Sequence, residues 1–271
     1  MTHIEITSRK NKLISDICKL SDKRERDNTG LFLAEGIKLL EESVLSGCCI
    51  EKLFFTEKAL KAYGNEISNA SALENYLVTD EVYSKLSQES APQGIMCCIK
   101  QNSIASISDE EIRNGKFLIL EDVQNPLNIG AIFRCAYSMG FTKVIMSDKC
   151  ADPYGPKAVR AAMGSLFKLQ LFRTESVTET IDRIKSFGNR VFCTALSKDS
   201  LVLGSFDFNQ TDSIIIGNEG HGVSDNTLLH STNSIYIPMN INAESLNAAT
   251  AAAIVLWEMN KNTLININEK S

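Results

Sequence analysis

A glycine-rich turn and the segment around it, Ser213 to Glu258, most constrain how this chain can fold. Two short apolar runs with strand character, Ile214 to Ile216 and Ile235 to Ile237, end at Gly217 and Pro238, and each opens a polar loop. Polar loops that follow neighbouring strands indicate a binding crevice at the carboxyl edge of a sheet.

Residues Ala248 to Trp257 then run almost entirely apolar, which predicts a helix buried on most of its face. Ser245 stands where it could cap the start of this helix. The polar residues of the two loops are Asn218, Glu219, His221, Asn242, Glu244, Ser245 and Asn247.

Composition is that of an ordinary globular protein, with 271 residues and 44% apolar content, enough for one large domain or two modest ones. No apolar run has membrane-spanning length, and the N-terminus lacks the hydrophobic stretch of a signal peptide, so we expect a cytoplasmic protein that does not contact membrane. The eight cysteines include the pairs Cys48-Cys49 and Cys97-Cys98 but no zinc-type spacing. We therefore expect reduced, buried thiols and no metal site.

The net charge of −5 is not that of a typical nucleic-acid-binding protein, but the charge is uneven. A solvated helix face and a phosphate-binding patch explain the basic N-terminus equally well. Its cations are Arg9, Lys10, Lys12, Lys19, Lys23, Arg24 and Arg26.

Strand-like and helix-like segments alternate along the chain, which predicts α/β architecture. We expect a first α/β domain over residues 1–100 and a second over residues 115–271. The polar stretch 101–114 between them is expected to be a linker. The second domain begins with the buried strand Phe117 to Leu120 and should form a largely parallel sheet. Its pattern also predicts a strand over Phe167 to Phe172 and a frayed tail from Lys261 to Ser271.

Dinucleotide binding and hydrolysis by a nucleophilic side chain both fit the sequence poorly. Gly217, Gly220 and Gly222 give the spacing G-x-x-G-x-G, whereas dinucleotide binding requires G-x-G-x-x-G. None of the three histidines lies in a recognisable nucleophile motif. Glu121 and Asp122 end a strand, but the sequence does not tie them to Glu219.

Three segments resemble the three motifs of the SpoU (TrmH-type) RNA 2′-O-ribose methyltransferases of the SPOUT superfamily. They are residues 128–136 (NIGAIFRCA), residues 216–222 (IGNEGHG), and residues 237–239 (IPM) with 244–247 (ESLN), in the family's order. The N-terminal half is similar to the family's substrate-binding domain at residues 8–11, 32–36 and 91–94.

This resemblance implies a small N-terminal α/β RNA-binding domain and a C-terminal SPOUT-type α/β domain with a trefoil knot, although general topology rules argue against a knot. It also implies a homodimer and S-adenosylmethionine as methyl donor for a ribose 2′-hydroxyl in RNA. Ribosomal RNA is expected over transfer RNA, because the N-terminal half is similar to that of the ribosomal members.

The resemblance assigns site residues by position. The family's cofactor contacts, largely backbone ones, correspond to Gly217, Ile237 and Leu246. Its catalytic polar residues correspond to Asn128, Arg134, Glu219, Ser245 and Asn247. A plain core position remains an alternative for Ile237 and Leu246.

Methyl transfer to an oxygen needs an aligned nucleophile whose developing negative charge is stabilised. An arginine is almost always protonated, so we interpret Arg134 as stabilising the alkoxide and not as a base. Asn240-Ile241-Asn242 and Ala248-Ala249 depart from the family's third motif, which leaves cofactor affinity open. The alternatives are a cofactor-free RNA-binding protein, a transfer-RNA enzyme, and a methyltransferase for a substrate other than RNA.

Overall fold

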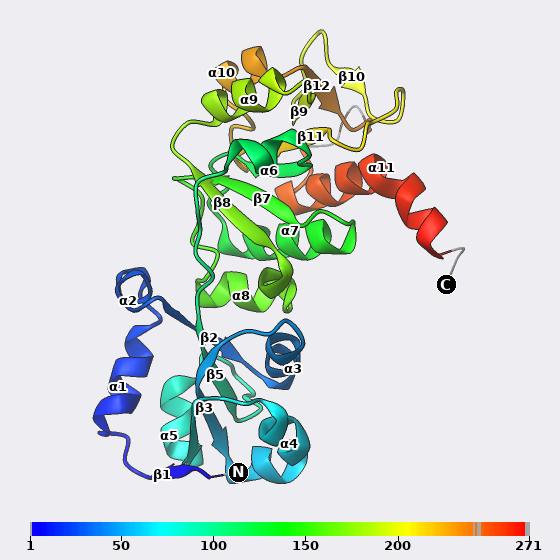
Figure 1. Cartoon of the computed structure of the whole chain (residues 1–271). Helices are drawn as coiled ribbons and strands as arrows, with labels where there is room; N and C mark the ends of the chain where they lie inside the picture. The colour runs from blue at the N-terminus through cyan, green and yellow to red at the C-terminus, as the bar shows by residue number, and fades with distance from the viewer. Residues whose placement is uncertain (1, 241, 243–244, 269–271) are drawn as a thin grey trace. The chain divides into compact units, whose positions relative to one another are not determined.

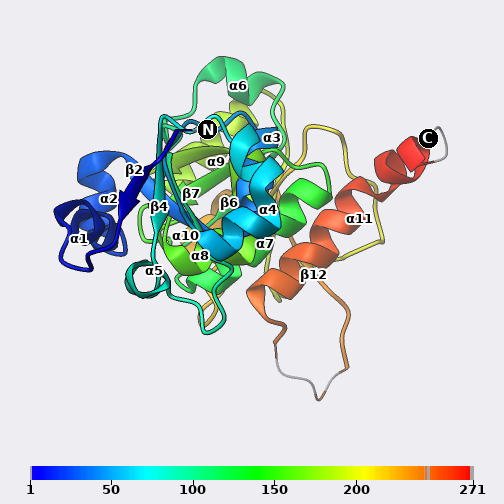
Figure 2. The same cartoon turned by 90° about the horizontal axis from the view of Figure 1, so that it is seen from below.

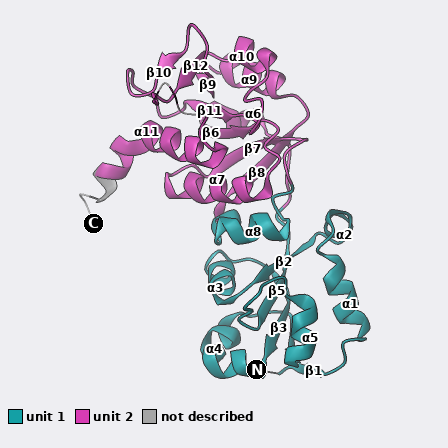
Figure 3. Cartoon of the chain, turned by 180° about the vertical axis from the view of Figure 1, so that it is seen from behind, with its two compact units in different colours: residues 1–102, 152–167 teal, residues 103–151, 168–271 magenta. Residues whose placement is uncertain are grey.

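The computed structural model describes residues 2–240, 242 and 245–268. It forms two compact units (Figure 3). Unit 1 contains the chain up to residue 102 together with residues 152–167, and unit 2 contains residues 103–151 and the chain from residue 168. Ile241 and Glu244, both in the polar loop of the third motif, lie outside the described residues.

Unit 1 is a five-stranded sheet in the order β1-β4-β3-β5-β2, in which β5 is antiparallel to both of its neighbours. Helices α1 and α5 pack together beside the sheet, and α3 and α4 pack together on its other side (Figure 1). Its elements are β1 (Ile4–Ile6), α1 (Lys12–Lys19), α2 (Lys23–Thr29), β2 (Leu31–Glu35), α3 (Ile37–Leu45), β3 (Ile50–Thr56), α4 (Glu57–Asn69), β4 (Glu74–Val78), α5 (Asp80–Leu86), β5 (Ile95–Lys100) and α8 (Pro156–Ala162).

Residues 152–167 pack with unit 1, although the sequence places them far beyond its other elements. The ring of Phe32 lies 4.9 Å from that of Tyr154 and 6.2 Å from that of Phe167. The buried Arg26 donates through Nη2 to Asp152 Oδ2 at 2.5 Å. Aromatic packing and this ion pair therefore hold the segment in unit 1.

Unit 2 contains a seven-stranded sheet in the order β10-β12-β9-β11-β6-β7-β8, and every neighbouring pair is parallel. The predicted α/β fold with a largely parallel sheet is confirmed. Its elements are α6 (Asp109–Arg113), β6 (Phe117–Leu120), α7 (Pro126–Ser138), β7 (Lys143–Ser147), β8 (Gln170–Thr174), α9 (Val177–Ser186), β9 (Val191–Thr194), β10 (Leu201–Val202), β11 (Ser213–Ile216), α10 (Asp225–His230), β12 (Asn233–Tyr236) and α11 (Ala248–Asn268).

The central strands of this sheet are apolar because both faces are covered. All four residues of β6 are buried. Phe117 and Ile119 belong to a core cluster with residues of α6 and α9, against which Leu228 of α10 also packs. Helix α11 packs along α7, and the two helices lie side by side in both views (Figures 1 and 2).

Several elements differ from the sequence prediction. Phe167 and Lys168 belong to a short 3-10 helix, Ser165–Lys168, so strand β8 begins only at Gln170. Helix α6 lies within the predicted linker and starts with a capping box between Ser108 and Glu111.

The predicted frayed tail is wrong as far as Asn268, because α11 continues through it; residues 269–271 lie outside the described part. None of the described helices is both long enough and apolar enough to cross a membrane.

Candidate active site

A cavity of about 460 Å³ lies in unit 2 at the carboxyl ends of β9, β11 and β12. These strands are parallel neighbours, so their ends, Thr194, Ile216 and Tyr236, meet at one edge of the sheet. The start of α11 closes the cavity through Ala248 and Ala251. The crevice expected from the two polar loops is therefore present.

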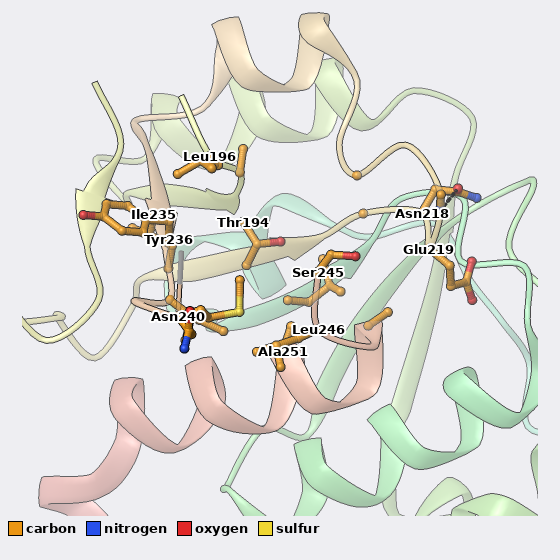
Figure 4. Close-up of a pocket in the computed structure, with 18 residues that line it drawn as sticks. Thr194, Leu196, Asn218, Glu219, Ile235, Tyr236, Asn240, Ser245, Leu246 and Ala251 are labelled. Carbon is orange, nitrogen blue, oxygen red and sulfur yellow. Dashed lines mark hydrogen bonds between the residues drawn. The ribbon is translucent and has the colours of Figure 1, made fainter. Parts of the chain in front are cut away.

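The cofactor residues assigned by resemblance, Gly217, Ile237 and Leu246, all line this cavity. Figure 4 shows Ser245 and Leu246 in its middle, with Glu219 at one end. Most of the lining is aliphatic or backbone, with a few polar groups. Such a lining is typical of sites for small organic ligands.

The loop after β11 is closed by a pair of backbone hydrogen bonds. The Asn218 N–H donates to Gly222 O and the Gly222 N–H donates to Asn218 O, both at 2.9 Å. The side chain of Asn218 donates through Nδ2 to the carbonyl oxygen of Asp122 at 2.8 Å. A Cβ on Gly217 would lie 2.2 Å from the carbonyl carbon of Gly222, so a larger residue there would force the loop open.

This loop presents the carboxylate of Glu219 to the start of α7. Glu219 accepts hydrogen bonds from Asn128 Nδ2 (2.9 Å), the Asn125 N–H (2.9 Å) and the Gln124 N–H (3.1 Å). Burial by itself raises the pKa of Glu219, but these hydrogen bonds outweigh it and the pKa is lowered. Glu219 is therefore a fixed negative charge at neutral pH.

Asn128 joins the first and third motifs. It is buried, with 7% of its surface exposed, and its Oδ1 accepts a hydrogen bond from Asn247 Nδ2 at 3.0 Å. Residues from three segments far apart in sequence, Glu219, Asn128 and Asn247, thus form one hydrogen-bonded chain.

The predicted capping role of Ser245 is wrong, because α11 begins at Ala248 and Asn247 caps it instead. Asn247 Oδ1 accepts from the Ala249 N–H at 2.9 Å and the Thr250 N–H at 3.4 Å. Ser245, three residues before the helix, lines the cavity.

Arg134 is not part of this chain of contacts. It lies on α7, is exposed, and makes no hydrogen bond or ion pair with any residue that the structure describes. It also does not line the cavity. Its guanidinium is therefore free to meet a group from outside this chain.

Glu121 and Asp122, for which the sequence predicted no role, hold the chain on either side of this loop through hydrogen bonds. Buried Glu121 accepts from Thr227 Oγ1 (2.8 Å) and the Ser224 N–H (3.2 Å). Asp122 has a left-handed backbone (φ 56°), and its carbonyl accepts from Asn218. An aspartate two residues after the end of a strand is a weak signal for such a turn, because its short polar side chain tolerates this conformation.

Two family models match the chain. The SpoU rRNA Methylase family matches residues 115–257, more than half of the chain, and the MRM3-like substrate binding domain matches residues 11–97. The first match runs through residues 152–167, which pack with unit 1.

Relatives of known activity match over nearly their whole length. The chain is 30% identical to RlmP of Bacillus subtilis, a 23S rRNA (guanosine(2553)-2'-O)-methyltransferase, over 94% of this chain and 98% of that protein. An AdoMet-bound rRNA methyltransferase from Sinorhizobium meliloti superposes with a TM-score of 0.83 at 26% identity, covering 96% and 98% of the two chains. The SpoU methyltransferase AviRb of Streptomyces viridochromogenes, in complex with AdoMet, also has a TM-score of 0.83, at 25% identity and 94% and 99% coverage.

Along the chain, the match to a substrate-binding domain comes first and the match to a methylase domain follows it. The predicted family, and with it the predicted class of enzyme, is confirmed. The chain belongs to the SpoU rRNA methylase family.

Proposed function

We propose that this protein transfers a methyl group from S-adenosylmethionine to a ribose 2′-hydroxyl of ribosomal RNA. The observation that carries the proposal is the hydrogen-bonded chain of Glu219, Asn128 and Asn247 at the end of the cavity. It brings together polar residues of all three motifs next to a pocket for a small organic ligand. The activities named for the relatives support ribosomal RNA as the substrate.

The residues of the cavity fit the cofactor. Its volume of about 460 Å³ lies within the range of about 300 to 1,000 Å³ usual for small-molecule sites. Ile237 and Leu246 offer aliphatic surface to a flat ring, and Thr194 and Ser245 offer hydroxyls. Bound there, the cofactor supplies an electrophilic methyl group on a positively charged sulfur. Glu219 places a fixed negative charge at one end of the same cavity.

Arg134 has the role of stabilising the oxyanion of the attacking ribose. Its free, exposed guanidinium supports this role, because nothing in the described chain competes for its five N–H donors. Asn128 and Glu219 act on the same side of unit 2 by holding the start of α7, the helix that carries Arg134. Asn247 fixes the start of α11 against them.

We propose a homodimer formed through the outer faces of α7 and α11. Large apolar side chains are exposed on these two helices: Leu127 (49%), Tyr137 (39%) and Trp257 (45%). A second copy of the chain would cover them, and such symmetric interfaces are the commonest kind. A trefoil knot through the segment 213–258 is part of the same proposal.

We propose that RNA binding and methyl transfer belong to different parts of the chain, which the two family matches support. Residues 1–100 bind RNA, and residues 115–271 bind the cofactor and carry out the chemistry, with 101–114 between them. We also infer a cytoplasmic location, in keeping with bacterial relatives named as methyltransferases of 23S rRNA. A cofactor-free RNA-binding protein fits less well, because the residues of the cavity and its hydrogen-bonded chain are intact.

The test is methylation of ribosomal RNA from a strain that lacks this protein, using purified chain and S-adenosylmethionine with a labelled methyl group. We expect label in a 2′-O-methylnucleoside after nuclease digestion, and Glu219→Gln should lower the yield. Glu175→Gln is the matched control, because Glu175 is exposed and has no hydrogen bond or ion pair among the described residues. Label on a base, or none in ribosomal RNA while transfer RNA is labelled, would contradict the proposal.

A further inference from the structure

Unit 1 contains two adjoining cavities, of about 450 and 490 Å³, that none of the assigned catalytic or cofactor residues lines. They lie at the carboxyl ends of the parallel strands β3 and β4, where α4 and α5 begin. Both are lined by Lys58 and Asp80, so together they form one open groove, called here the α4–α5 groove. We propose that the α4–α5 groove binds a single-stranded stretch of the RNA substrate, a proposal that takes its ligand from the proposed function.

The first cavity has the side chains that a nucleobase requires. Tyr63 is half-buried in its lining and offers an aromatic face, and Pro92 offers a second flat surface. Gln93 Oε1 accepts a hydrogen bond from the Ile37 N–H at 3.0 Å, which holds the amide in place. The Gln93 amide nitrogen has no partner among the described residues, so it can donate to a base edge.

The floor of this cavity is rigid. Gly94 has a φ of +79°, and a Cβ there would lie 2.4 Å from Thr56 Oγ1. The Thr56 N–H donates to Gly94 O at 3.0 Å, and Thr56 Oγ1 in turn accepts from the Ala59 N–H at 3.2 Å. Gly94 therefore packs closely against Thr56, and these contacts place the floor of the cavity at the end of β3.

The second cavity supplies charge beside the first. Lys58 is exposed and has no ion pair within the described chain, so its ammonium can meet a phosphate. Lys61 is engaged with Glu57 at 2.7 Å. Asp80 lines both cavities and can accept a hydrogen bond from a ring N–H or an amino group of a base; uracil offers its N3–H.

A concave groove of this kind favours unpaired RNA. In a duplex the bases are stacked and paired, whereas an unpaired base can stack on an aromatic side chain and expose its edges. Lys58 lines both cavities and Tyr63 lines the first, so a phosphate bound at Lys58 would lie next to a base stacked on Tyr63. In the N-terminal basic stretch, by comparison, Lys19, Lys23 and Arg26 are held in ion pairs.

Binding of a fluorescently labelled 12-nucleotide oligouridylate to the full chain tests the proposal. We expect Tyr63→Ala to weaken binding about 5- to 150-fold, the range for losing one base–aromatic stack. Tyr63→Phe should bind as the wild type does, since it keeps the ring. Leu45→Ala is the control, because Leu45 is an exposed apolar residue of the same unit that does not line the groove. Binding of Tyr63→Ala within twofold of the wild type would overturn the proposal.

Salt dependence supplies a second measurement that does not depend on Tyr63. If Lys58 contacts a phosphate, Lys58→Gln should reduce the slope of log Kd against log salt concentration by about 0.7, the value for one contact with a single strand. An unchanged slope overturns the proposal. So does a duplex of the same length that displaces the oligouridylate as well as the unlabelled single strand does.

Methylation assays separate this proposal from the proposed function. With ribosomal RNA as substrate, Tyr63→Ala should raise KM and leave kcat unchanged, because the groove binds substrate and transition state equally. An unchanged KM in an active enzyme overturns the groove alone. A wild-type chain that shows the expected oligouridylate binding but methylates no RNA overturns the function alone.

Discussion

Replacing Glu219 with glutamine tests whether the central carboxylate holds the site together. The carboxylate accepts three hydrogen bonds, from Asn128 Nδ2 and from two backbone N–H groups. A glutamine keeps at most two acceptor contacts, without charge, and turns its own amide N–H toward the remaining donor. Charge-assisted hydrogen bonds contribute about 1.5 to 3 kcal/mol when buried and neutral ones about 0.5 to 1.5 kcal/mol.

Solvent reduces this difference, because the Glu219 residue is exposed. We therefore expect Glu219→Gln to lower the free energy of unfolding of unit 2 by about 1 to 2 kcal/mol, and its Tm by about 2 to 8 °C. Thermal unfolding followed by circular dichroism at pH 7 gives the value. The Glu175→Gln control should leave Tm unchanged.

The dependence on pH gives the sharper check. The pKa of Glu219 is lowered in the folded protein from its usual value of 4.5. A carboxyl group with a lowered folded pKa contributes stability that is present above the unfolded pKa and is lost as pH falls through the folded pKa. The Tm difference between wild type and Glu219→Gln should therefore be full at pH 7 and shrink below pH 4.5. A difference that stays constant or grows in acid would refute the reasoning.

Three further changes test the remaining parts of the site. Arg134→Ala should lower the rate of single-turnover methylation at saturating RNA by about 100-fold, with little change in cofactor affinity. Arg134→Lys should restore little of that rate, since an ammonium lacks the planar fork of a guanidinium. A rate for Arg134→Ala within a few-fold of wild type would mean that Arg134 has no role in the chemistry. Gly217→Ala should weaken S-adenosylmethionine binding, measured by calorimetry, by more than 10-fold, on the order of 1.4 kcal/mol or more. The reason is that the new Cβ would lie 2.2 Å from Gly222. Gly220→Ala is the control that should bind normally, because the nearest atom to its Cβ would be 3.5 Å away. Sedimentation at micromolar concentration should give a dimer that Trp257→Glu dissociates, since Trp257 is 45% exposed on the proposed interface; a wild-type species of 29.9 kDa would exclude that interface.

The sequence alone was sufficient to predict the bounds of elements that are buried along their whole length. The strand predicted over Phe117 to Leu120 has the same bounds in the structure. Its signal is local, a run of apolar residues in a strand that is covered on both faces. The order of the three motifs was equally visible, because it is a property of the chain itself.

Contacts between distant segments were decided only by the tertiary structure. Glu219 and Asn128 are 91 residues apart, and no spacing rule predicts that one donates to the other. The same holds for Asn247, which replaces Ser245 as the helix cap because its side chain is held by Asn128. Phe167 leaves the strand pattern because it packs against Phe32 in unit 1. Local sequence sets which conformations are available, and burial against partners far along the chain selects among them.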